Sequence, residues 1–63
     1  MSGYEALIKS ILSKAGWKYL RQGKGSHEIW ELGKNHITIP KGCKSRHLAN
    51  EIMKQVGNSH RFN

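Results

Sequence analysis

Turn residues and two kinds of apolar spacing divide this sequence into five short segments. Residues 4–15 and 45–57 place apolar side chains at helical spacing, so that each stretch has one apolar face. Between them lie three stretches rich in aromatic and β-branched residues, 17–21, 26–32 and 36–39, which are typical of β-strands. The pattern therefore predicts the element order αβββα.

Both predicted helices have start and stop signals. Ser2 and Glu5 fit a capping box, in which each side chain bonds the other residue's backbone N–H, and Gly16 suits a left-handed stop. Ser45 is a candidate N-cap for the second helix, and Gly57 closes it. The predicted apolar faces consist of Tyr4, Leu7, Ile8, Ile11, Leu12 and Ala15 in the first helix and Leu48, Ala49, Ile52, Met53 and Val56 in the second.

The predicted strands are separated by short turns that contain glycine, at residues 23–25 and 33–35. Such turns favour hairpins, and Pro40 ends the third strand because it has no N–H for a ladder. We therefore expect an α+β fold with a three-stranded antiparallel sheet. With both helices on one face, the other face stays open, as in double-stranded RNA-binding domains.

Apolar residues fall on both faces of the second strand, because Ile29 and Trp30 alternate. One face is therefore expected to meet a partner or ligand. For Trp17, directly after the helix stop, we expect a role in locking helix to sheet. For Tyr19 and Trp30, a core position, stacking on bases and a protein interface all remain open.

Length and charge limit the size and the partners of the domain. The chain has 63 residues, enough for one small domain, which we place at residues 1–57 with a frayed polar tail at 58–63. Eleven Lys and Arg against four Asp and Glu give a net charge of +7, which favours a polyanion, most commonly nucleic acid. A basic solubility surface or a place in a larger complex is the alternative.

Several classes of protein are excluded. One cysteine, Cys43, allows no internal disulfide, no apolar run approaches the roughly 20 residues of a membrane span, and the first residues do not resemble a signal peptide. We therefore expect a reduced, cytoplasmic protein.

The histidines and Cys43 lack metal-ligand spacing, and Lys18 and Gly25 occupy positions where a P-loop needs other residues. Neither a metal nor a cofactor is therefore expected.

His27 is the main candidate for chemistry because it directly follows a basic, glycine-containing turn. A neutral imidazole can accept a proton, and RNA cleavage by its own 2′-OH needs such a base with cations to stabilise the phosphorane. The cations expected near it are Lys18, Arg21, Lys24 and Lys41. The alternative is an ordinary surface or packing histidine. Lys9, Lys14 and Lys54 are interpreted as solvated charges on helix faces.

Four segments together resemble the HicA toxin family of type II toxin–antitoxin modules, over about residues 5–57. The most specific is the basic turn that opens the second strand. The segments are Ala15-Gly16-Trp17, Lys24-Gly25-Ser26-His27, Ile37-Thr38-Ile39-Pro40 and Ile52-Met53-Lys54-Gln55-Val56-Gly57.

The resemblance implies a fold like that of double-stranded RNA-binding domains and metal-independent endoribonuclease action on mRNA, which arrests translation. It assigns the catalytic role of general base or acid to His27. RNA binding would involve Lys24, with Gly25 and Ser26 shaping the turn, and further cations at Lys18, Arg21 and Lys41. The resemblance also implies a HicB-type antitoxin that covers the site and supplies the DNA contacts of the complex. The alternative is a non-catalytic RNA-binding module on the same scaffold.

Overall fold

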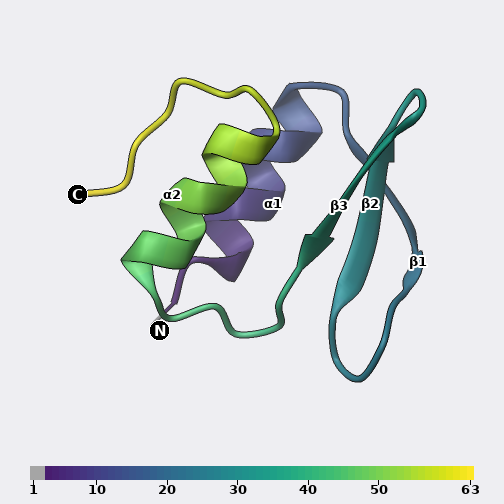
Figure 1. Cartoon of the computed structure of the whole chain (residues 1–63), viewed down its shortest axis with the longest axis horizontal. Helices are drawn as coiled ribbons and strands as arrows, with labels where there is room; N and C mark the ends of the chain where they lie inside the picture. Colours follow the sequence, from purple (N-terminus) through teal and green to yellow (C-terminus); the bar gives the residue numbers. More distant parts are fainter. Residues whose placement is uncertain (1–2) are drawn as a thin grey trace.

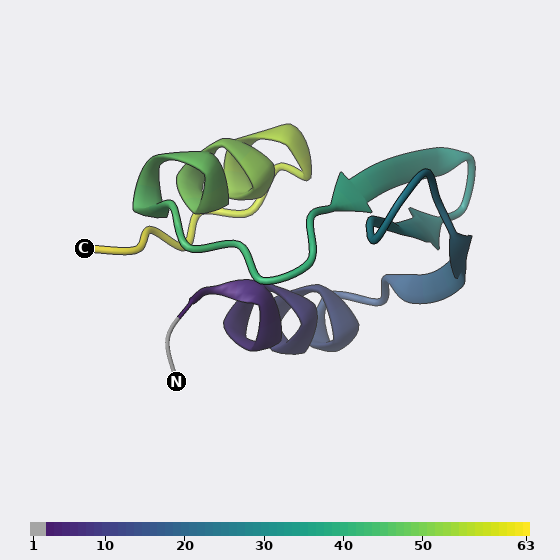
Figure 2. The same ribbon diagram turned by 90° about the horizontal axis from the view of Figure 1, so that it is seen from below.

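The computed structural model describes residues 3–63 and contains five elements in the predicted order. They are α1 (Glu5–Lys14), β1 (Lys18–Gln22), β2 (Glu28–Leu32), β3 (Asn35–Ile39) and α2 (Arg46–Gln55). The strands form an antiparallel meander in the order β1-β2-β3. Both helices lie on the same side of this sheet (Figures 1 and 2). The predicted small α+β fold is therefore confirmed.

The register of the sheet decides which side of β2 faces the helices. Trp30 pairs with Tyr19 on β1 and with Ile37 on β3, and both Trp30 and Ile37 are buried. Ile29 pairs with Arg21 and Thr38 on the opposite, open face. The ladder between β1 and β2 shifts between Tyr19 and Arg21, where a bulge interrupts the pairing. The apolar residue on the open face is thus Ile29, half-buried at the sheet surface.

The core lies between the helices and the inner face of the sheet. Trp17 is buried in it, as expected for a residue that locks α1 to the sheet. Trp30 is 8% exposed, so of the three alternatives open for it the structure supports the core position. Leu7, on the predicted apolar face of α1, is 52% exposed. The buried apolar residues are Ile8, Leu12, Trp17, Trp30, Ile37, Ile39, Cys43, Ala49, Ile52, Met53 and Phe62.

The helix ends agree only partly with the predicted signals. Ser45 Oγ accepts a hydrogen bond from the Leu48 N–H at 3.1 Å, so the predicted N-cap of α2 is confirmed. Gly16 and Gly57 both adopt positive φ angles just past the helices, as predicted. The N-cap residue of α1 is Tyr4, without a side-chain hydrogen bond, and Ser2 of the predicted capping box lies outside the described residues.

The segment 58–63 is ordered against the helices, so the expectation of a frayed tail is wrong. Phe62 is 7% exposed, and its ring packs edge-on against Tyr4 at 5.1 Å between centroids. Asn50 on α2 binds the Phe62 backbone twice, accepting from its N–H at 2.7 Å and donating to its carbonyl at 3.1 Å. One aromatic anchor and two hydrogen bonds therefore hold this polar segment in place.

Candidate nucleic-acid interface

Two loops meet at one end of the sheet. Glu28, the first residue of β2, pairs with Ile39, the last residue of β3. The β1–β2 loop before Glu28 and the β3–α2 loop after Ile39 therefore lie at the same end, as Figure 1 shows. His27 ends the first loop, and Lys41 follows closely in the second.

The β1–β2 loop holds His27 in a tight, braced turn. The His27 N–H donates to the Lys24 carbonyl at 3.2 Å, and the Gly23 N–H donates to the His27 carbonyl at 2.8 Å. Gly25 has φ of +64°, and Ser26 has no positive φ, which is the sign pattern of a type II′ turn. Gln22 Nε2 adds a third contact, to the Gly25 carbonyl at 3.2 Å. The backbone around His27 is thus fixed by the turn itself.

The side chains of this turn are available to a ligand. Lys24, Ser26 and His27 are all exposed. Gly23, by contrast, packs closely on the open face of the sheet, where a Cβ would lie 2.9 Å from Ile29 Cδ1. The base of the turn is therefore packed against the sheet, whereas the side chains at its tip are exposed.

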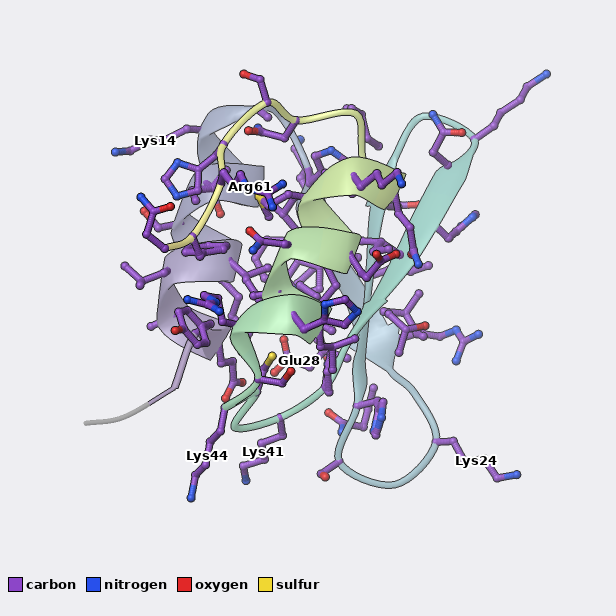
Figure 3. All side chains as sticks on the ribbon, turned by 60° about the vertical axis from the view of Figure 1, so that its left-hand side comes forward. Lys14, Lys24, Glu28, Lys41, Lys44 and Arg61 are labelled. Atoms are coloured by element: carbon purple, nitrogen blue, oxygen red, sulfur yellow. The ribbon has the colours of Figure 1, made fainter. Side chains whose placement is uncertain are left out.

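The predicted cations are only partly brought together. Lys24 and Lys41 project into solvent at the end of the sheet that bears His27, and Lys44 joins them there (Figure 3). Arg21 pairs with Ile29 next to the turn. Lys18 pairs with Glu31 and lies four residues before Gln22 on β1, roughly 13 Å away at strand spacing. The structure therefore places Lys18 towards the other end of the hairpin from His27.

Lys9 is paired with two carboxylates, so the expectation of a solvated charge is wrong for this residue. Its Nζ lies 2.8 Å from Glu5 Oε2 and 3.0 Å from Glu28 Oε2, and these are the ion pairs found within residues 3–63. Glu28 Oε1 also accepts from Trp30 Nε1 at 3.0 Å, and Glu5 Oε1 accepts from the Gly42 N–H at 2.7 Å. The Glu5–Lys9 spacing of four residues is visible in the sequence, whereas the contact with Glu28 needs the fold.

The pKa values of these groups reflect the network. A hydrogen bond from Lys9 and then one from the Gly42 N–H lower the pKa of Glu5, and the nearby charge of Lys41 adds to this. Hydrogen bonds from Trp30 and Lys9 lower the pKa of Glu28. For Lys9, partial burial is the largest single influence and lowers its pKa, but the bonds to both carboxylates together outweigh it and raise the pKa.

The other histidines lie away from the turn. His36 pairs with Glu31 on the open face of the sheet, and His60 packs edge-on against Phe62 in the C-terminal segment. His47 lies on the exposed side of α2. Within residues 3–63, no three His, Cys, Asp or Glu side chains gather closely enough to hold a metal ion.

Tyr19 is 51% exposed and meets the Trp30 ring edge-on.

Comparison with known proteins bears on the function of this arrangement. A family model described as the HicA toxin of bacterial toxin–antitoxin systems matches residues 7–57, most of the chain. The chain belongs to the HicA toxin family. It is therefore the toxin of a toxin–antitoxin system and has a cognate antitoxin as its partner. No curated protein and no solved structure matched it.

The HicA match includes both loops at the candidate interface and stops before the segment that carries Phe62. No helix in the described part of this HicA toxin has the length and apolar character to cross a membrane.

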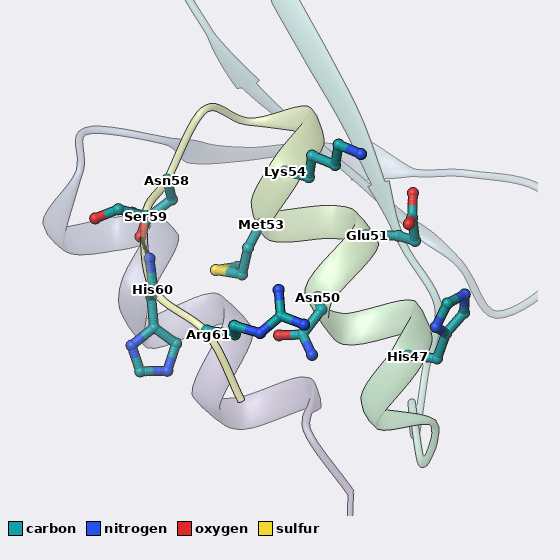
Figure 4. Close-up of a pocket in the computed structure, with 9 residues that line it drawn as sticks. All are labelled: His47, Asn50, Glu51, Met53, Lys54, Asn58, Ser59, His60 and Arg61. Carbon is teal, nitrogen blue, oxygen red and sulfur yellow. Dashed lines mark hydrogen bonds between the residues drawn. The ribbon is translucent and has the colours of Figure 1, made fainter. Parts of the chain in front are cut away.

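A groove of about 340 Å³ lies between α2 and the C-terminal segment, and the Arg61 side chain extends over it (Figure 4). None of the residues that line this groove belongs to the predicted site.

Proposed function

We propose that this HicA toxin is a metal-independent endoribonuclease that cleaves mRNA and so stops translation. The observation that carries the proposal is the placement of His27, exposed on a braced turn at the end of the sheet to which Lys24 and Lys41 also belong. Membership of the HicA toxin family supports this use of the turn.

In the proposed reaction His27 acts first as general base. Its imidazole takes the proton of an RNA 2′-OH while the 2′-oxygen bonds to the adjacent phosphorus. The bond from phosphorus to the 5′-oxygen breaks, and that oxygen takes a proton from water or from a protonated imidazole. RNA thus supplies its own nucleophile, and the protein contributes proton transfer and positive charge.

The neighbouring residues hold the scissile phosphate in this proposal. Lys24 lies on the same turn as His27, and Lys41 lies on the second loop at the same end of the sheet. Arg21 pairs with Ile29 on the open face close to the turn, and Lys18 would bind RNA at the other end of β1. Gly25 and Ser26 give the turn its shape and leave room for a phosphodiester.

The cognate antitoxin in this proposal is of the HicB type and covers the same end of the sheet. A protein seated on the β1–β2 turn would exclude RNA from His27. DNA would then be bound through the antitoxin, and the positive charge of this chain would serve RNA.

The test is cleavage of a mixed-sequence RNA in EDTA by the purified chain and by His27→Ala. A well-placed base contributes about 10²- to 10⁴-fold, so the variant should lose cleavage by that factor and keep its circular dichroism spectrum. His36→Ala is the matched control, because His36 is also exposed but lies on β3, away from the turn. If neither wild type nor variant cuts while both bind RNA equally, the chain is a binding module.

A further inference from the structure

We propose that Lys9 is a positioning residue that holds the His27 turn and the Lys41 loop together, so that base and cation act on one phosphate. This inference rests on the proposed ribonuclease function. Lys9 lies on α1, and its ammonium reaches a carboxylate from α1 and one from β2. Through these two carboxylates it connects the two loops of the candidate interface.

The first arm of the network ends beside His27. Lys9 Nζ binds Glu28 Oε2 at 3.0 Å, and Glu28 is the residue that directly follows His27. The other carboxylate oxygen of Glu28 accepts from the buried Trp30 ring at 3.0 Å. Glu28 is therefore held from both sides, and in Figure 3 it lies inside the molecule while Lys24 and Lys41 point outwards.

The second arm ends beside Lys41. Lys9 Nζ binds Glu5 Oε2 at 2.8 Å, and Glu5 Oε1 accepts from the Gly42 N–H at 2.7 Å. Gly42 directly follows Lys41, and the Tyr4 N–H donates to the Cys43 carbonyl one residue further on. The start of α1 thus fixes the backbone of the loop that presents Lys41.

Lys9 also sets the charge at the base of the site. Glu5 and Glu28 are close enough for the charge of Glu5 to raise the pKa of Glu28, and Lys41 is close enough to lower the pKa of Glu5. Without Lys9, these two carboxylates would repel each other and would compete with RNA for Lys41. With Lys9, one positive charge lies between them, and its side chain is 26% exposed.

The test compares kcat/KM for RNA cleavage in Lys9→Met, Lys9→Arg and Lys14→Met. Misplacing catalytic groups costs up to about 10²-fold, so we expect Lys9→Met to lose 10- to 100-fold. Lys9→Arg should recover most of this because a guanidinium can bridge two carboxylates. Lys14→Met, at the far end of the same helix, removes an exposed charge and should keep wild-type activity (Figure 3).

A double-mutant cycle separates positioning from simple stabilisation. If Lys9 positions Lys41, then Lys41→Ala should cost much less in a Lys9→Met background than in wild type. The cycle of Lys9→Met with Lys18→Ala should be multiplicative, because Lys18 lies away from the network. Multiplicative behaviour in both cycles would overturn the inference.

Glu28→Gln keeps the inference testable if Lys9→Met does not fold. This change removes the ion pair with Lys9 but keeps an oxygen for Trp30 Nε1, and it should show the same coupling to Lys41→Ala. Failure of the proposed function gives a different result. Either wild type does not cleave RNA, or His27→Ala cleaves it as fast as wild type does. If His27→Ala is inactive and Lys9→Met is fully active, only the positioning role is wrong.

Discussion

Gly25 and Gly33 occupy equivalent positions in the two hairpin turns. Their φ angles are +64° and +62°, and a Cβ at either position would meet nothing within 4 Å. The cost of a side chain is therefore conformational at both, because L-residues avoid this region. The turns differ in what they carry: Gly25 lies two residues before His27, whereas Gly33 begins the turn at the other end of the sheet.

The equivalence of Gly25 and Gly33 predicts that substitutions at the two positions have equal effects on stability and unequal effects on activity. Gly25→Ala and Gly33→Ala should each lower the free energy of unfolding by about 1–2 kcal/mol, measured in urea. Gly25→Ala should also reduce RNA cleavage because the Lys24–His27 turn must change shape. Equal cleavage by the two variants would show that the shape of this turn does not matter for activity.

At the residue scale, the sequence predicts local features better than distant ones. The turn glycines and the Ser45 cap depend on neighbouring residues, and they were correctly predicted from them. The sequence suggests only a solvated charge at Lys9, because its contact with Glu28 crosses from a helix to a strand 19 residues away. The proximity of Lys41 to the His27 turn follows from the antiparallel meander, so it could be expected once the strands were recognised.

At the scale of elements, periodicity predicts both helices because each buries one apolar face. All five residues of β1 are exposed, so this strand is predicted by its residue types and by the glycine turn that follows it. Register is harder: the bulge between Tyr19 and Arg21 has no clear signal in the sequence, and the side of β2 that faces the core depends on how all three strands pair. The order of segment 58–63 is not predictable from the sequence, because one aromatic residue among polar ones has no periodicity. Its order depends on Tyr4 and Asn50, which are distant in sequence.

Phe62→Ala tests the contribution of this segment. Truncation of a buried Phe costs about 3–5 kcal/mol, and a chain of this size is expected to have only roughly 3–9 kcal/mol in total. We therefore expect a large drop in thermal midpoint, measured by circular dichroism. His60→Ala is the control, since it removes an exposed ring that touches Phe62 and should change the midpoint little. Equal midpoints for Phe62→Ala and wild type would exclude the segment from the core.

At the scale of the whole molecule, the Lys9 network makes stability depend on pH. The pKa values of Glu5 and Glu28 lie below the ordinary 4.5 in the folded state. Their stabilising contribution is therefore complete above pH 4.5 and is lost as the pH falls through the folded values. The pKa of Lys9 is raised above 10.5, so its contribution is complete below pH 10.5 and is lost at higher pH.

We therefore expect a thermal midpoint that is level through the neutral range and falls below about pH 4.5. Glu28→Gln should have a lower midpoint at neutral pH and a shallower fall in acid, because one of the two carboxylates is gone. Glu51→Gln, on an exposed position of α2, should keep the wild-type slope. If the thermal midpoint of Glu28→Gln falls in acid as steeply as that of wild type, the Glu28–Lys9 pair is not the origin of the acid dependence.

The rate at which Cys43 reacts with a thiol reagent reports on opening of the loop that contains Lys41. Its Sγ is buried and donates to the Ser45 carbonyl at 3.6 Å, so a thiol reagent can reach it only when the β3–α2 loop opens. Because the chain has one cysteine, the rate of thiol labelling comes from this site alone. Under native conditions that rate measures how often the second loop of the interface leaves its place.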